Sequence, residues 1–217
     1  MANFLRLSNV VALTLMLMVF LVHSASAIDQ RAPEQIVKEV TTAVLAVLNE
    51  DQARLKEDPT LVNNLIYETI IPIVDLNSMG KLILGKHWKW ASEEQRLRFV
   101  SEFKDMLVRI YAKSLVDYGH AKVKVLPDRN RKESKYHTVQ TELYIGSGKT
   151  PLRVAYIFRN NKQDEWKVFD LSVDGLSLVK NFRTSFGQEI KETSLDALIE
   201  RLADTKITGA KDGMKTE

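Results

Sequence analysis

The spacing of apolar residues changes near residue 120, and this change restricts the fold more than any other feature of the sequence. Before it, apolar side chains recur at helical intervals, most clearly over residues 93–118, where Phe99, Phe103 and Tyr111 share one face. After it, apolar and polar residues alternate, which is typical of half-buried strands. The alternating segments span residues 122–125, 139–145, 152–159 and 165–173. Short turns between them predict hairpins, so we expect an α+β fold with helices packed on one face of a roughly four-stranded antiparallel sheet.

Capping signals predict where the helices begin and end. Asp58 and Pro59 interrupt the first helical region, and a short helix over residues 76–84 should end at Gly85. Ser92 and Gln95 form a capping-box pattern at the start of the long helix. Two last helices are expected over residues 176–191 and 194–203.

The N-terminus has the three parts of a secretory signal. Arg6 supplies the positive charge, residues 10–22 are apolar, and the small residues 25–27 form a cleavage signal. A retained membrane anchor is the alternative, but the apolar run is shorter than the roughly 20 residues that a span needs. We therefore expect residues 1–27 to be removed, residues 28–204 to form one domain, and the polar residues 205–217 to be a disordered tail. The sequence has no cysteine to carry a lipid anchor, so we expect the mature protein to be free of the membrane.

Charge and composition exclude several classes of protein. Removing the signal takes away one positive charge, so the formal net charge falls from +3 to +2. The sequence has no block of basic residues, so we do not expect nucleic-acid binding. The absence of cysteine excludes a disulfide scaffold and a thiol enzyme.

Two glycine-containing motifs resemble catalytic or phosphate-binding loops only in part. Residues 146–150 read Gly-Ser-Gly-Lys-Thr, but Leu143 stands where a phosphate-binding loop needs glycine and a strand follows, which favours a hairpin turn. Ser177 follows Gly175, but Val179 replaces the second glycine of a nucleophile elbow, which favours a helix start.

The polar residues give little reason to predict an enzyme. His87, His120 and His137 have no metal-ligand spacing, and we expect surface or turn positions for all three. Asp170 with His137 is the one acid–base pair that the sequence offers to a hydrolase or isomerase, although a solvated or capping role for Asp170 is favoured. The apolar stripes fit either a filled core or a ligand cavity, and periodicity does not separate the two.

A resemblance to a known family bears on that choice. The residues that carry it fall in two regions: 71–75, 84–88 and 91–96 with Phe99, Phe103 and Tyr111, and 166–170 and 175–178 with Asn181, Arg183 and Phe186. Together, over residues 32–204, the chain resembles the MlaC (toluene-tolerance) family. Ser92 and Glu93 depart from the Thr-Pro that the family often has, but both versions cap a helix.

The resemblance implies a periplasmic carrier without enzymatic activity and without a cofactor. Its cargo would be a glycerophospholipid whose acyl tails lie in an apolar cavity between the sheet and the helices. Its partners would be an outer-membrane lipoprotein complex and an inner-membrane ABC transporter with a ring of MCE domains, and its role would be outer-membrane lipid asymmetry. We expect a monomer. Shared faces and the resembling segments together predict the following cavity lining: Leu84, Trp88, Phe103, Leu107, Tyr111, Val139, Leu143, Val154, Tyr156, Trp166, Val168, Phe182 and Phe186.

Two alternatives stay open at this point. One is a carrier of another apolar molecule, such as a hopanoid or a solvent. The other is a small cavity-based hydrolase or isomerase.

Overall fold

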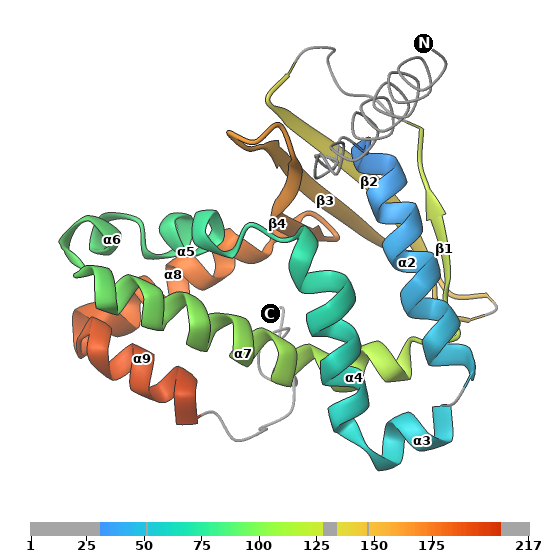
Figure 1. The fold of residues 1–217 in the computed structure, drawn as a ribbon, viewed down its shortest axis with the longest axis horizontal. Coiled ribbons are helices and arrows are strands. Elements are labelled where there is room, and N and C mark those ends of the chain that lie inside the picture. The colour runs from blue at the N-terminus through green and yellow to red at the C-terminus, as the bar shows by residue number, and fades with distance from the viewer. Residues whose placement is uncertain (1–30, 51, 128–133, 147, 205–217) are drawn as a thin grey trace, which may run out of the picture.

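The computed structural model describes residues 31–50, 52–127, 134–146 and 148–204, so the expected signal and tail lie outside the described residues (Figure 1). The helical elements before the sheet are α2 (Pro33–Glu50), α3 (Gln52–Glu57), α4 (Pro59–Leu65), the π-helix η2 (Ile66–Ile70), the 3₁₀-helix η3 (Ile71–Ile73), α5 (Leu76–Leu84), α6 (Lys86–Trp90) and α7 (Glu93–Asp117). The strands are β1 (Lys122–Val125), β2 (Tyr136–Tyr144), β3 (Leu152–Asn160), β4 (Trp166–Val173) and β5 (Leu176–Ser177), and the chain continues in α8 (Leu178–Glu192) and α9 (Leu195–Asp204).

The sheet confirms the predicted α+β class. Its strands follow one another in chain order, β1-β2-β3-β4-β5, and every neighbouring pair is antiparallel. All four expected strands are present. Residue 147 lies outside the described residues, but β2 and β3 pair from Leu143 and Leu152 onward, so the segment between them connects a hairpin as predicted.

The end of the sheet differs from the prediction at one point. Residues 176 and 177 form the short strand β5, and the next helix begins at Leu178 rather than at residue 176. Asp174 and Gly175 both have positive φ, which turns the chain back to pair with β4. The Ser177 hydroxyl then accepts a hydrogen bond from the Lys180 N–H and caps α8, which confirms its predicted role at a helix start.

The predicted helix boundaries before the sheet are confirmed by their caps. Asp58 caps α4 by accepting from the Thr60 N–H, and α5 ends at Gly85, whose φ of 53° suits glycine. At the start of α7, Ser92 and Gln95 satisfy each other's backbone N–H groups in a capping box.

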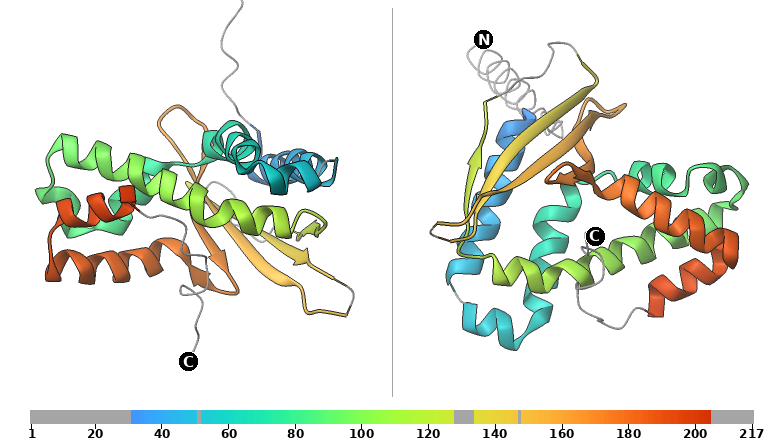
Figure 2. Two further views of the ribbon diagram at one scale, coloured as in Figure 1. Left: turned by 90° about the horizontal axis from the view of Figure 1, so that it is seen from below. Right: turned by 180° about the vertical axis from the view of Figure 1, so that it is seen from behind.

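Three apolar clusters hold these elements together. The helical cluster joins α5, α7, α8 and α9 and includes Phe99, Phe103 and Phe186. The second joins α2, α3, α4, η2 and the later turns of α7. The third, which we call the α2–sheet cluster, joins Ile36 and Val37 to three strands. The long helix α7 therefore links the first two clusters. Helix α2 packs on the sheet, at the end of the molecule opposite to α6 and α9 (Figure 1, Figure 2).

Candidate functional site

One face of the sheet carries all six of the strand residues predicted to line a cavity. Residues that pair across antiparallel strands point to the same side, and residues two apart on one strand do the same. The register pairs Val139 with Tyr156 and Leu143 with Leu152. Val139, Leu143, Val154, Tyr156, Trp166 and Val168 therefore share a face. Because α2 packs on it through Ile36 and Val37, we call it the α2 face.

The α2 face is fully covered at one end only. Val139, Phe158 and Val168 are buried in the α2–sheet cluster, and Val139 is just 2 % exposed. Toward the β2–β3 turn, the apolar side chains on the same face are half-buried. We call this part the open half of the α2 face, and it consists of Leu143, Leu152, Val154, Leu171 and Val173. None of these five belongs to the three clusters that the described residues form.

Helix α7 lies across from the sheet but makes its closest approaches elsewhere. Among the described elements, α2, α5, α8 and η3 come nearest to the strands, whereas the close neighbours of α7 are α3, α4, α5 and α9. Figure 2 shows α7 and the strands as separate layers of the molecule. Helix α7 is therefore not a close packing partner of the open half of the α2 face.

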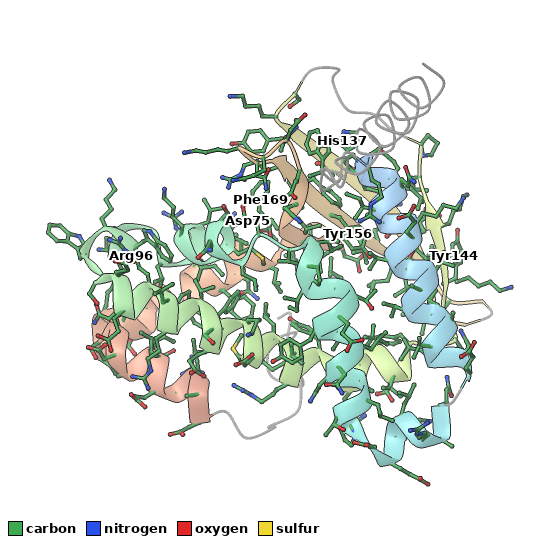
Figure 3. All side chains as sticks on the ribbon, in the orientation of Figure 1. Asp75, Arg96, His137, Tyr144, Tyr156 and Phe169 are labelled. Atoms are coloured by element: carbon green, nitrogen blue, oxygen red, sulfur yellow. The ribbon has the colours of Figure 1, made fainter. Side chains whose placement is uncertain are left out.

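Two tyrosines, one on the sheet and one on α7, have a raised pKa. Tyr156 stands where the α2–sheet cluster meets the open half, and burial raises the pKa of its hydroxyl (Figure 3). Burial also raises the pKa of Tyr111 on α7, although 39 % of that residue is exposed. Both phenols are neutral near pH 7, which suits an apolar ligand.

A buried hydroxyl belongs to the same face. Thr141 is 1 % exposed and donates a hydrogen bond of 3.1 Å to the Val154 backbone carbonyl. The Tyr156 hydroxyl is also hydrogen-bonded to Thr141, so the polar atoms here are satisfied within the protein. This part of the α2 face therefore presents apolar groups and no unpaired hydroxyl of Thr141 or Tyr156.

The helix residues of the predicted lining lie in a different place. Leu84, Phe103 and Phe186 are buried in the helical cluster, and Trp88, Leu107 and Phe182 pack against it. The ring centroids of Phe103 and Phe182 are 5.2 Å apart, and those of Phe182 and Phe186 are 5.1 Å apart. Rings at these distances fill space between helices. The structure thus divides the predicted residues into a strand group on the α2 face and a helix group in a packed aromatic core. Tyr111 belongs to neither group.

Sequence reasoning missed three residues of the open half. Leu152, Leu171 and Val173 pair with Leu143, Tyr156 and Val154 across the strands. The alternation pattern put Leu152 on the correct face of its strand, but β4 contains a bulge opposite Ile157 and Phe158 that shifts the register. The pattern alone did not reveal that shift.

Asp170 and His137 each have a structural partner of their own. The Asp170 carboxylate accepts from the Ser177 hydroxyl at 2.6 Å and from the Val179 N–H at 3.0 Å, so it acts as a cap. His137 is hydrogen-bonded to Glu34 of α2 and lies against Trp166 (Figure 3). The acid–base pair considered for a hydrolase or isomerase is therefore not brought together. Within the described residues there is no cluster of three or more potential metal ligands.

The expectation of surface or turn histidines is wrong for two of the three. His137 lies half-buried in β2 because its partner Glu34 arrives from a helix about a hundred residues earlier, which local spacing does not reveal. His87 is half-buried on α6, and burial lowers its pKa, with Lys86 and Lys191 adding to the effect. His120 is exposed in the turn after α7, as predicted.

A surface hollow of about 540 Å³ lies beyond the open half, between the β2–β3 and β4–β5 turns. Thr150, Pro151, Leu152, Arg153, Asp174 and Gly175 line it. The Arg153 N–H donates to the Asp174 carboxylate at 3.0 Å, so much of its wall is polar. It brings together none of the thirteen predicted residues.

Comparison with known proteins identifies the family. The family model described as MlaC protein matches residues 38–204. The chain belongs to the MlaC family. It is 24 % identical over 191 residues to the intermembrane phospholipid transport system binding protein MlaC of Haemophilus influenzae, covering 88 % of this chain and 89 % of that protein. It is 26 % identical over 167 residues to the toluene tolerance protein ttg2D of Pseudomonas putida, covering 76 % of each.

A solved structure shares the MlaC fold seen here. The phospholipid-binding protein of Ralstonia solanacearum, solved in complex with a phospholipid, superposes with a TM-score of 0.72 at 24 % identity, covering 80 % of this chain and 96 % of the other. The fold resemblance and the family match agree with the α+β prediction. Among the described residues, no helix has the length and apolar character that crossing a bilayer requires.

Proposed function

We propose that this MlaC-family chain is a periplasmic carrier that holds a glycerophospholipid by its acyl tails against the open half of the α2 face. The observation that carries this proposal is the contrast along one sheet face. Val139 is buried under α2, while Leu143, Leu152 and Val154 are apolar, half-buried and outside every cluster. An apolar wall of this kind is the surface that acyl tails need.

The energetics of lipid transfer favour such a carrier. Each buried methylene contributes about 0.8 kcal/mol, so two tails of about 14 methylenes each cost on the order of 20 kcal/mol to expose to water. Free lipid would cross an aqueous compartment at a negligible rate. The carrier must keep both tails dry, while the head group can stay in water at the mouth of the cavity.

The proposed path of the lipid runs between two membranes. The named relatives include a binding protein of an intermembrane phospholipid transport system and a toluene tolerance protein. These names support transport of phospholipid between two membranes. We propose as exchange partners the outer-membrane lipoprotein complex and the inner-membrane ABC transporter with an MCE-domain ring that the family resemblance implies. Maintaining outer-membrane lipid asymmetry is the role that follows. It requires export and cleavage after Ala27, and no catalytic residue.

Mass spectrometry of an organic-solvent extract of the purified mature protein tests the cargo. We expect about one glycerophospholipid for each protein molecule. A hopanoid or other polycyclic lipid in its place would show that the cargo is different. Protein that holds no lipid and hydrolyses or isomerises a small substrate would contradict the carrier function altogether.

A further inference from the structure

A tryptophan side chain is exposed to solvent at the end of the molecule farthest from the sheet. Trp90 closes α6 and is 86 % exposed, although tryptophan is among the more buried residues in most proteins. Two more apolar side chains are exposed on the neighbouring helices, Leu82 of α5 at 37 % and Leu97 of α7 at 63 %. In both Figure 1 and Figure 2, α6 lies at this end, away from the strands.

The helix that presents Trp90 is held rigidly. The Arg96 guanidinium donates to the backbone carbonyl of Trp88 at 2.9 Å and to that of Lys89 at 3.4 Å (Figure 3). The same guanidinium lies over the Trp88 ring, 5.6 Å from its centroid, and Trp88 packs against the helical cluster. One tryptophan of α6 thus anchors the helix inward while the other points to solvent. Because the backbone of α6 is already fixed, little backbone entropy is lost when the side chain that it presents inserts into a partner.

The segment that carries Trp90 is positively charged, and the exposed residues Glu93 and Glu94 follow it at the start of α7. Residues 76–92 contain Lys81, Lys86 and Lys89 and no acidic residue. All three lysines are exposed, and none forms an ion pair with a carboxylate of the described residues. We call Trp90 with these three lysines the α6 tip.

The geometry points to a second binding site: the α6 tip docks on the surface of an anionic phospholipid bilayer. Tryptophan favours the interface between head groups and acyl chains, where its ring is buried and its N–H stays hydrated. Long lysine side chains lie along the apolar boundary and extend their ammonium groups to lipid phosphates. A single exposed aromatic ring with surrounding unpaired cations fits a fluid anionic surface better than a shaped protein pocket, which would need a larger apolar patch.

This site is distinct from the proposed cargo site. The α6 tip lies on α5 and α6, while the open half of the α2 face lies on β2, β3 and β4. Docking would hold the carrier at a membrane while lipid enters or leaves elsewhere. The two functions can therefore be separated by mutation.

Vesicle flotation with the mature chain tests the proposal. Vesicles of phosphatidylcholine alone are compared with vesicles of equal parts phosphatidylcholine and phosphatidylglycerol, at low and at high salt. Trp90→Ala and the double variant Lys86→Gln/Lys89→Gln probe the α6 tip. Leu176→Ala, which removes a 65 % exposed side chain on β5, and Lys180→Gln on α8 are matched controls. Tryptophan emission is recorded alongside, because Trp88 and Trp166 are half-buried and Trp90 is the exposed indole.

We expect the wild-type chain to bind the anionic vesicles, to shift its emission to shorter wavelength on binding, and to release in high salt. Trp90→Ala should lower the partition coefficient about tenfold, and each neutralised lysine should lower it about fivefold. Both tip variants should keep their co-purified lipid, and both controls should bind as the wild type does. Equal binding to neutral and anionic vesicles, or unchanged binding by folded Trp90→Ala, would overturn the proposal. Loss of outer-membrane barrier function in the tip variants without any wild-type vesicle binding would also overturn it, and would indicate an acidic protein partner.

Discussion

An arginine substitution at two positions on the same sheet face can show which of them lies in packed core and which lies against the lipid. Val139 and Val154 are valines on neighbouring strands, and their side chains point to the same side. Val139 is buried against Ile36 and Phe158, whereas Val154 is half-buried in the open half of the α2 face. Val139→Arg and Val154→Arg therefore make the same chemical change in two different surroundings.

The expected costs differ by several kcal/mol. At Val139, the guanidinium has no path to water, so an unpaired buried charge costs several kcal/mol. That is a large part of the 5–15 kcal/mol that stabilises a typical domain. At Val154, the arginine stem can lie along the apolar wall and extend its head group to water, so we expect a loss of about 1 kcal/mol. The hydrogen bond from Thr141 to residue 154 uses the backbone carbonyl and survives the substitution.

Urea unfolding and the amount of co-purified phospholipid give the two readouts. Val139→Arg should be insoluble or largely unfolded. Val154→Arg, and likewise Leu143→Arg, should be soluble and unfold cooperatively with much less bound phospholipid. Ala155→Arg is the control, since Ala155 points to the other face of β3, and it should retain the lipid. Insoluble Val154→Arg would mean that the open half is packed core, and folded Val154→Arg with undiminished lipid would mean that the tails lie elsewhere.

Four further outcomes follow from the structure. Phe186→Ala should lower the free energy of unfolding by about 3–5 kcal/mol, measured in urea, because it empties part of the aromatic core. Ser92→Ala removes the capping box of α7 and should cost about 1 kcal/mol in the same assay. Burial, aided by the hydrogen bond to Asp105, raises the pKa of Tyr67 to about 12, so Tyr67→Phe should remove one of the late-titrating phenols from an ultraviolet titration. The contribution of the neutral Tyr67 phenol to the free energy of unfolding should be complete below the ordinary pKa of 10 and should be lost as the pH rises toward 12. Burial lowers the pKa of His87, so the folded state resists its protonation, and the melting temperature should fall as the pH drops below the ordinary value of 6.5, less steeply in His87→Gln.

Local features of the fold were predictable because their causes lie within a few residues. The capping box of Ser92, the aspartate cap at Asp58 and the glycine stop at Gly85 each depend on neighbours in sequence. The alternation of β2 and β3 likewise fixed which strand residues share a face. These features sufficed for the α+β class.

Features that depend on distant residues were not predictable from the pattern. Periodicity identifies an apolar face but not what covers it, so Phe103 and Leu143 looked equivalent although one lies in the aromatic core and the other in the open half. The bulge in β4 and the pairing of His137 with Glu34 arise from contacts between separate elements. The division of the predicted lining into two groups is therefore a result of the three-dimensional structure.

Photo-crosslinking tests most directly the claim that acyl tails lie on the open half of the α2 face. The mature protein is loaded with a phospholipid that carries a diazirine on one acyl tail, irradiated, digested and mapped by mass spectrometry. We predict crosslinks to peptides containing Leu143, Leu152, Val154 and Tyr156, and their loss in Val154→Arg. Crosslinks confined to Phe103, Phe182 and Phe186, or to the opposite face of the sheet, would contradict the account.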